Sequence, residues 1–479
     1  MITDINPLQK THLTRIVATL GPASFNELGI EQLIHAGVDV FRINFSHGDH
    51  KQHSETIRRV RAVCRRLNKH ISILQDLGGP KLRINELDED HIHLYPGESI
   101  CLRDGVEKGD KTCIGFTDED WFDQVKPGER VVLGDGIIHL QIERKGKSEL
   151  ECKVLSGGVL RARAGLNFPE SDLNLGAMRP KDWEDLKFGL ENNVDVVALS
   201  FVQGPEDLIK VREVMKDYEF DPILIAKIER PEAVERIDDI LEHSGGIMVA
   251  RGDLGISVPL QKVPTIQKFL IKKAREQRKL VITATQMLES MTTSPMPTRA
   301  EVTDVANAVF DGTDAVMLSG ETAIGVDPPL VVRRMSDILI EAEANAIFPT
   351  LPKTDRSMDS AISQVVPMLV KEIESKLVVS PLTSGSTAVR ISRQRIGVPI
   401  LAGVSTERDA RRIRIYHAVN PVVVDKEASF MDNLRYIMQL ATELKLVQEG
   451  DYTVVTGGLP LDRPGVTNFL RVVKVGDEI

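Results

Sequence analysis

Short apolar runs that end in polar or charged side chains recur along the first two thirds of the chain. They occupy residues 15–21, 39–46, 72–77, 195–201, 223–229, 246–253, 280–287 and 315–322. Most are rich in Val, Ile and Leu, which is typical of parallel strands covered on both faces. Helical periodicity lies between them, for example at 26–36, 53–67, 182–191, 205–216 and 263–277. This alternation predicts an α/β fold, a (β/α)8 TIM barrel with its active site at the carboxyl ends of the strands.

One interval breaks the alternation. Asp76 and Ser200, which end the third and fourth runs, are much farther apart in sequence than any other neighbouring pair. Residues 84–163 have little helical pattern, and alternating segments at 137–142 and 150–154 are bounded by turn dipeptides such as Pro96-Gly97. This predicts a small all-β domain over the barrel mouth. Its two interpretations are a lid that closes on substrate and an inert decoration.

The last part of the chain predicts a separate domain. After a linker at 348–355, apolar segments at 377–380, 400–404, 422–424, 453–456 and 470–475 alternate with helical patterns. We expect a doubly wound α/β domain over 350–479. The barrel then comprises 1–83 and 164–347, and the inserted β lid domain comprises 84–163.

Composition narrows the class of protein. A net charge of −10 argues against a nucleic-acid surface. The four cysteines show no zinc-site spacing and are expected to be free thiols. No apolar stretch is long enough to span a membrane, and the N-terminus has no secretory pattern. We therefore expect a cytoplasmic protein without a membrane partner.

The polar strand ends suggest a chemistry. Lys227 and Glu229 point to the same side of one strand, and Asp253 ends the next. Two carboxylates with open positions suit Mg²⁺ or Mn²⁺, and Arg42 and Arg83 add positive charge for a multiply charged anion. Neither a Walker A pattern nor a strand-linked Gly-x-Gly-x-x-Gly is present. The residues alone predict a metal-dependent barrel enzyme acting on a small phosphorylated acid.

Five segments then resemble motifs of the pyruvate kinase family, in that family's order. They are 39–48 (DVFRINFSHG), 223–229 (ILIAKIE), 248–255 (MVARGDLG), 283–290 (TATQMLES) and 298–325, which includes MLSGETA. The resemblance covers almost the whole chain and implies the same three-domain layout. It implies Mg²⁺-dependent transfer of a phosphoryl group from phosphoenolpyruvate to ADP, giving pyruvate and ATP.

The resemblance also implies residue roles. Glu229 and Asp253 would hold the divalent ion, and Lys227 would stabilise charge on the phosphoryl group and the enolate. Substrate would further contact Arg42, Asp253, the Gly252 N–H and Thr285. A water relay through Thr285 and Ser319 would protonate the enolate, because a threonine hydroxyl is a poor acid. The residues expected near the nucleotide or its metal are Asn44, Ser46, His47, Arg83 and Lys181.

The chain departs from the family at residues 76–81, Asp-Leu-Gly-Gly-Pro-Lys, where many members have Asp-Thr-Lys-Gly-Pro-Glu. In those members K⁺ is held by groups that match Asn44, Ser46, Asp76 and the backbone of Leu77. Here Lys81 replaces the nearby glutamate, and its ammonium could supply the positive charge. We expect an enzyme that does not require K⁺. The alternative is that Lys81 points to solvent and K⁺ still binds. A second departure lies at 174–181, the segment that contains Lys181.

Two further expectations concern regulation and assembly. A loop between a predicted strand and helix could bind phosphate, and the resemblance implies a sugar-phosphate or nucleotide effector there. This loop comprises Thr383, Ser384, Gly385, Ser386 and Thr387. Unregulated members carry similar loops, so an inert loop is the alternative. Family members are usually homotetramers. The rival functions are a metal-dependent barrel lyase or aldolase and a catalytically silent regulator.

Overall fold

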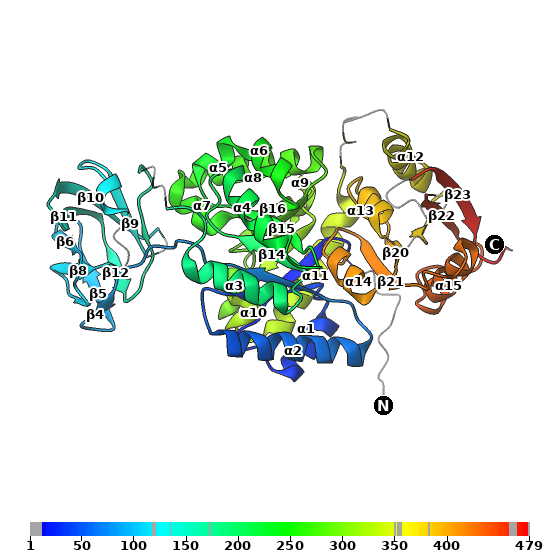
Figure 1. Ribbon diagram of the computed structural model, residues 1–479, viewed down its shortest axis with the longest axis horizontal. Coiled ribbons are helices and arrows are strands. Elements are labelled where there is room, and N and C mark those ends of the chain that lie inside the picture. The colour runs from blue at the N-terminus through cyan, green and yellow to red at the C-terminus, as the bar shows by residue number, and fades with distance from the viewer. Residues whose placement is uncertain are drawn as a thin grey trace.

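The computed structural model describes residues 12–116, 121–134, 136–171, 173, 175–348, 351, 357–381, 384–458 and 467–477. The molecule is elongated, with the barrel in the middle, the β insert at one end and the C-terminal α/β part at the other (Figure 1). Among the described residues, no helix has both the length and the apolar character needed to cross a membrane.

Eight parallel strands close the barrel, in the order β1-β18-β17-β16-β15-β14-β3-β2. Their bounds are β1 Arg15–Thr19, β2 Val40–Asn44, β3 Ser72–Asp76, β14 Val196–Leu199, β15 Ile223–Ile228, β16 Gly246–Ala250, β17 Leu280–Ala284 and β18 Ala315–Leu318. Nearly every strand residue is buried, because the helices cover the outside and side chains fill the inside. The prediction of a (β/α)8 barrel is confirmed.

Helices follow the strands as the periodicity indicates. They are α1 Glu27–Ala36, α2 His50–Leu67, α3 Pro180–Glu191, α4 Pro205–Met215, α5 Pro231–Glu235, α6 Ile237–His243, α7 Arg251–Ser257, α8 Val263–Glu276, α9 Arg299–Asp311, α10 Gly320–Ala323 and α11 Pro328–Asn345, with short 3₁₀ turns η2 Leu260–Lys262 and η3 Glu289–Thr292. Helix α2 begins three residues earlier than expected, because the Asp49 side chain caps it by accepting from the Gln52 N–H. The sixth strand ends at Ala250, so Asp253 lies in the first turn of α7 and not on the strand.

The insert is an all-β unit, as predicted. Its main sheet has the order β13-β9-β10-β11-β6-β8, and two smaller pairs, β12-β5 and β4-β7, accompany it. The bounds are β4 Glu86–Leu87, β5 His91–Leu94, β6 Ser99–Arg103, β7 Lys108–Gly109, β8 Cys113–Gly115, η1 Phe122–Gln124, β9 Arg130–Leu133, β10 Ile138–Lys145, β11 Glu149–Ser156, β12 Gly158–Arg161 and β13 Leu166–Asn167. Two connecting segments join it to the barrel, and they pair through hydrogen bonds from Ile84 N to Ala164 O (3.0 Å) and from Leu166 N to Leu82 O (3.0 Å).

The C-terminal part has a five-stranded sheet of order β21-β20-β19-β22-β23, parallel except for β23. Its elements are α12 Met358–Glu372, β19 Leu377–Ser380, α13 Ser386–Ser392, β20 Ile400–Val404, α14 Glu407–Ile413, β21 Val419–Val423, α15 Phe430–Glu443, β22 Tyr452–Gly457 and β23 Phe469–Lys474. Strand β21 begins three residues before the predicted segment. It includes Pro421, which the sheet accepts because β21 is an edge strand.

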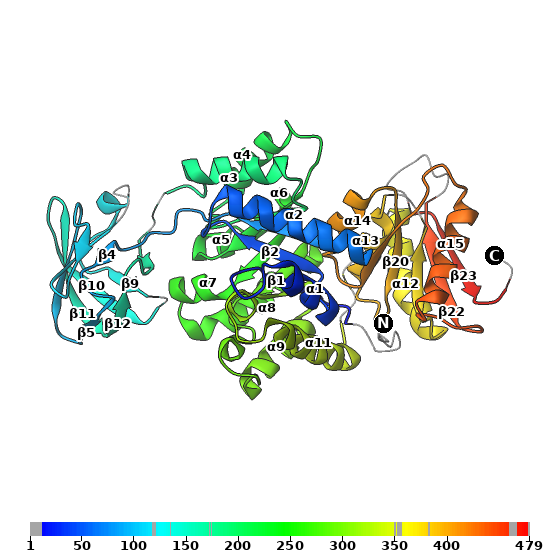
Figure 2. The same ribbon diagram turned by 90° about the horizontal axis from the view of Figure 1, so that it is seen from below.

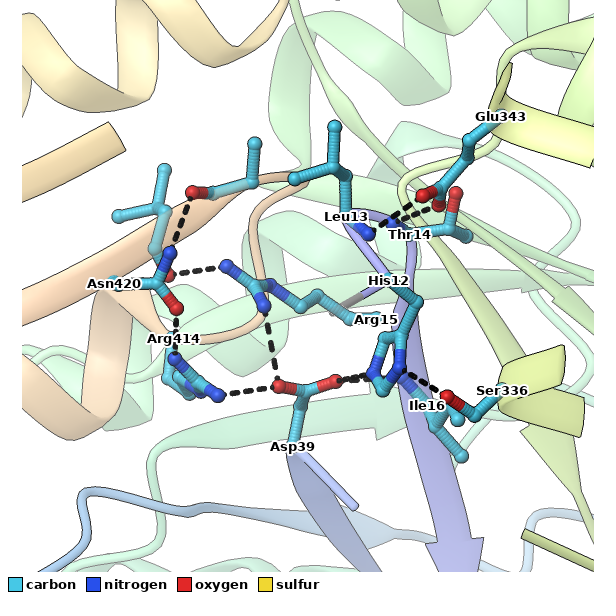
Figure 3. A network of polar contacts seen from close by, with 12 residues as sticks. His12, Leu13, Thr14, Arg15, Ile16, Asp39, Ser336, Glu343, Arg414 and Asn420 are labelled. Carbon is cyan, nitrogen blue, oxygen red and sulfur yellow. Dashed lines mark hydrogen bonds and ion pairs between the residues drawn. The ribbon is translucent and has the colours of Figure 1, made fainter. Parts of the chain in front are cut away.

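Buried ion pairs join the barrel to this C-terminal part (Figure 3). Asp39, which is 1% exposed, pairs with Arg15 of β1 at 3.2 Å and with Arg414, which follows α14, at 2.7 Å. Arg15 reaches across to donate from Nε to the Tyr416 carbonyl at 2.9 Å. These contacts lie at the amino-terminal end of the barrel strands, opposite the end where the predicted site residues gather.

Candidate active site

A buried ionic centre lies at the carboxyl ends of β3, β14 and β15. The Lys227 ammonium lies 3.1 Å from Asp76 Oδ1 and 3.0 Å from Glu229 Oε1. It also donates to Ser200 Oγ at 2.6 Å. Parallel strands bring these side chains together because their carboxyl ends meet at one rim of the barrel. The Lys227 side chain is 11% exposed, so the ammonium is largely shielded from solvent.

The charges of this centre depend on one another. Burial alone would lower the pKa of Lys227, but the carboxylates of Asp76 and Glu229 raise it above its usual value. Burial would raise the pKa of Asp76, yet Lys227 and Arg42 hold it below the usual range. For Glu229, burial dominates, so its pKa is raised despite Lys227, and Asp253 raises it further. Lys227 therefore stays protonated near neutral pH, and the charge of Asp253 disfavours ionisation of Glu229.

Arg42 is fixed at the same rim. Its Nε donates to Asp76 Oδ2 at 2.7 Å, and another guanidinium nitrogen donates to Thr19 Oγ1 at 3.0 Å. Neighbouring His47 has a pKa below its usual value because of burial and then the charges of Arg83, Arg42 and Lys81. The barrel mouth thus collects positive charge suited to a phosphorylated ligand.

Asp253 faces a second cation. Lys81 Nζ lies 3.1 Å from Asp253 Oδ1, and both side chains are 27% exposed. A cleft between the connecting segments of the insert and the barrel is lined by these two residues together with Phe168, Phe201 and Arg230. Lys81 therefore points into the mouth and does not extend into solvent.

The carboxylates fit a divalent ion that binds few protein ligands. Glu229 Oε2 accepts from the Phe201 N–H at 2.7 Å, whereas the buried Oε1 accepts no hydrogen bond and faces only the Lys227 ammonium among the described groups. Across the described residues, no group of three or more His, Cys, Asp or Glu side chains is arranged to hold a metal. Mg²⁺ usually takes only one or two carboxylates from the protein and binds substrate oxygens at its other positions. The pair of Glu229 and Asp253 meets that requirement.

A strained turn follows β17. Thr285 and Gln286 both have positive φ, at 70° and 53°. A β-branched residue rarely adopts this backbone, and such strain tends to occur at functional sites. The Thr285 hydroxyl accepts from the Gly252 N–H at 2.7 Å and donates to the Ala284 carbonyl at 2.6 Å. Two groups expected near the substrate carboxylate are therefore bonded to each other in this structure.

Arg251 holds that turn and was not anticipated from the sequence. Its guanidinium donates to the Thr285 carbonyl at 2.7 Å and the Ala284 carbonyl at 3.3 Å, and it also pairs with Asp304 at 2.7 Å. Arg251 directly follows β16 and precedes Gly252. Its position at a strand end could have marked it as a candidate site residue. We assign Arg251 as a positioning residue that holds the turn containing Thr285.

Replacing Arg251 by Lys is expected to lower kcat about tenfold, since one ammonium can keep the Asp304 pair but cannot also hold the carbonyls of Ala284 and Thr285. KM for the substrate and the thermal midpoint should change much less than kcat. Steady-state kinetics and calorimetry measure these quantities. Arg299→Lys, on an exposed residue of α9, is the matched control. A kcat within twofold of the wild-type value would contradict the positioning role.

The other predicted residues are spread around the rim. Asn44 Oδ1 accepts from the Ser46 N–H at 3.1 Å, and Arg83 donates to the Arg163 carbonyl at 3.0 Å. The Lys181 ammonium pairs with Asp185 at 2.6 Å and donates to the Phe45 carbonyl at 3.0 Å. The Ser319 N–H donates to Glu321 at 2.6 Å. Asp185 was missed because it lies within a helix, where sequence offers no strand-end signal.

The predicted effector loop is described only in part, since Thr383 lies outside the described residues. Gly385 has φ 66°, and the hydroxyls of Ser384 and Ser386 lie 2.9 Å apart. The Thr387 hydroxyl is buried against Thr467 at 2.9 Å. Thr387 therefore has a packing role, while Ser384 and Ser386 line a cavity between this loop and the barrel.

Comparisons with known proteins agree with this geometry. The family profile described as "Pyruvate kinase, barrel domain" matches residues 11–332, and "Pyruvate kinase, alpha/beta domain" matches residues 360–473. A pyruvate kinase of Staphylococcus epidermidis is 39% identical over 473 residues, covering 97% of this chain and 81% of that protein. A pyruvate kinase of Staphylococcus aureus is 40% identical with the same coverage. The chain therefore belongs to the pyruvate kinase family of phosphotransferases.

Proposed function

We propose that this chain transfers a phosphoryl group from phosphoenolpyruvate to ADP, giving pyruvate and ATP. The observation that carries the proposal is Lys227, held as a buried cation between Asp76 and Glu229 at the mouth of a pyruvate kinase barrel. The bond between phosphorus and the enol oxygen breaks, and a bond to a β-phosphate oxygen of ADP forms. Negative charge develops on the enol oxygen and is carried by the oxygens of the transferring phosphoryl group, so both need fixed cations nearby.

Arg42 and Lys227 supply those cations in our proposal. Asp76 holds both from one carboxylate, through Oδ2 to Arg42 at 2.7 Å and through Oδ1 to Lys227 at 3.1 Å. Their relative position is thus set before substrate arrives, which avoids reorganisation during the reaction. Lys227 would face the enolate oxygen, and Arg42 would face the phosphoryl oxygens.

Glu229 and Asp253 would hold a divalent cation, Mg²⁺ or Mn²⁺. When bound, the ion would neutralise charge on the phosphoryl group and the substrate carboxylate. Lys81 would have to share or release Asp253 for this to occur, given their 3.1 Å contact. The Gly252 N–H and Thr285 would turn from each other to the substrate carboxylate.

The enolate requires a proton at its methylene carbon. Thr285 lies at the rim with its hydroxyl hydrogen-bonded to the Ala284 carbonyl. A threonine hydroxyl is too weak an acid to donate directly, so a water relay that passes Thr285 and Ser319 is our proposal. ADP would lie on the side of the mouth formed by Asn44, Ser46, His47, Arg83 and Lys181. The homotetramer and the effector at the 383–387 loop remain predictions.

The test is pyruvate formation from phosphoenolpyruvate with ADP and Mg²⁺. Omitting ADP or chelating the divalent ion should each abolish the activity, because the phosphoryl group then lacks an acceptor or charge neutralisation. Pyruvate formed at the full rate without ADP would mean that the phosphoryl group passes to water, and it would contradict the proposal. A folded protein inactive with every component present would support a silent regulator.

We further propose that the enzyme does not need K⁺, because Lys81 already supplies a monovalent cation to the mouth that contains Asn44, Ser46, Asp76 and Leu77. In this structure the Lys81 ammonium contacts Asp253, and its charge contributes to lowering the pKa of His47. The observed orientation favours this over a lysine in solvent.

The wild-type rate should be the same in tetramethylammonium and K⁺ buffers. Lys81→Glu should lose activity at least about tenfold without K⁺ and recover on its addition, because a carboxylate then needs a cation partner. Lys108→Glu, on an exposed strand of the insert, is the control for added charge. A wild-type enzyme that is inactive without K⁺ would overturn this proposal and leave the assigned reaction in place.

A further inference from the structure

A second basic cavity lies far from the mouth, between the barrel and the C-terminal part. Its volume is about 270 Å³, and it is lined by the C-terminal end of α2 and by α14. Figure 2 shows α2 running along the barrel towards α14. The charged lining residues are Arg61, Arg65, Lys69, His70, Glu407 and Arg411.

Two of these arginines are anchored by one buried carboxylate. Arg61 lies 2.7 Å from Asp195 Oδ2, and Arg411 lies 3.2 Å from Asp195 Oδ1. Asp195 is fully buried. The two guanidiniums therefore come from different parts of the chain but have fixed positions, which is the arrangement that recognises an anion at little entropic cost.

Two further cations at the cavity lack protein partners. Both are exposed, and within the described chain the side chains of Arg65 and Lys69 form no hydrogen bond or ion pair. Glu407 is 65% exposed and lies 4.0 Å from Arg411, so it gives little compensation. Four cationic side chains thus face two carboxylates, which leaves an excess of two positive charges.

Two titratable groups at the cavity, Lys69 and His70, have pKa values below their usual range. Burial and then Arg414 lower the pKa of Lys69. Burial lowers the pKa of His70, and Arg414, Arg411 and Lys69 lower it further, against Glu407. A cavity that makes protonation unfavourable for its own residues is one where an anion would relieve repulsion.

We propose that this cavity binds a phosphoryl group, carried by a small phosphomonoester or present as free phosphate. A phosphomonoester carries nearly two negative charges near neutral pH, which matches the excess of the cavity. Its three oxygens suit two guanidiniums and an ammonium, whereas a carboxylate would engage only one of them fully. The cavity volume is large enough for a phosphoryl group with a short organic part but too small for a polymer. Because α2 and α14 both line the cavity, the ligand would bridge the barrel and the C-terminal part.

Glycerol 2-phosphate is a suitable probe, with glycerol as its uncharged control. Titration calorimetry on the intact protein should show saturable binding, and hydrogen exchange should show protection at 61–71 and 405–414. The double variant Arg65→Gln/Lys69→Gln should weaken binding at least about tenfold and lose that protection. A parallel titration with inorganic phosphate shows how much the organic part contributes.

Arg66→Gln is the matched control. Arg66 lies on the same turn of α2 but pairs with Glu31 at 2.8 Å, outside the cavity. It should bind the probe within about twofold of wild type. Circular dichroism verifies that all variants fold. Equal affinity in the wild type and the double variant, or protection confined to the barrel mouth, would overturn the proposal.

Discussion

Replacing Lys227 by Met is expected to lower kcat about 10³-fold, because the proposed phosphoryl transfer would then lack the cation that we place beside the developing enolate charge. Methionine has nearly the same length and preserves the packing. Asp76 keeps Arg42 as its partner at 2.7 Å, but Glu229 loses the ammonium at 3.0 Å. Its already raised pKa should rise further, since burial would act without the opposing charge.

Steady-state pyruvate formation at saturating phosphoenolpyruvate and ADP measures this effect. The control is Lys216→Met, which removes an exposed lysine just after α4 and should leave kcat unchanged. Circular dichroism separates lost chemistry from lost folding. A folded Lys227→Met enzyme that retained more than about a tenth of the wild-type kcat would contradict the assigned role.

The largest stability effect is expected from Asp39→Asn, at the opposite end of the barrel. Asp39 accepts from the Ile16 N–H at 3.0 Å and from His12 at 3.1 Å, in addition to its pairs with Arg15 and Arg414 (Figure 3). Asparagine would leave two guanidiniums without their shared carboxylate. Burial already lowers the pKa of Arg15 to about 10, so its charge is costly when unpaired. We expect destabilisation of about 3 kcal/mol.

This loss should depend on pH in a defined direction. Arg414 and Arg15 hold the pKa of Asp39 below its usual range against the opposing effect of burial. A carboxyl with a depressed folded-state pKa stabilises above its unfolded pKa, about 4, and that stabilisation is lost as pH falls below it. The difference between wild type and Asp39→Asn should therefore be full near neutral pH and shrink in acid.

Urea unfolding followed by circular dichroism at several pH values tests this. Asp217→Asn, on an exposed aspartate, is the control and should change stability by less than about 0.5 kcal/mol. A difference for Asp39→Asn that stays below about 1 kcal/mol, or that grows as pH falls, would contradict the account.

The architecture was predictable because its signals are local. Apolar runs with polar ends fix the eight barrel strands, and the absence of helical periodicity marks the insert. The sequence predicts a strand that ends at Asp253, because the apolar run 246–250 continues into Arg-Gly-Asp without a break. The structure ends that strand at Ala250 and starts a helix at once.

Pairing across the mouth was much harder to predict. Strand ends alone place Arg42, Asp76 and Lys227 at one rim, yet the sharing of Asp76 by both cations depends on the closed barrel. The contact of Lys81 with Asp253 depends on how the connecting segment of the insert crosses the rim, which periodicity does not report. The contacts of Arg251 with the carbonyls of Ala284 and Thr285 were not predictable, because backbone partners leave no mark in the side-chain pattern.

Phosphorus NMR of a mixture of phosphoenolpyruvate, ADP and Mg²⁺ with the wild-type enzyme tests the central claim most directly. We predict that the phosphoenolpyruvate signal is replaced by the γ-phosphate signal of ATP, with one pyruvate formed for each ATP. Release of inorganic phosphate in place of ATP would contradict phosphoryl transfer to ADP, and so would pyruvate formed without any change in the ADP signals.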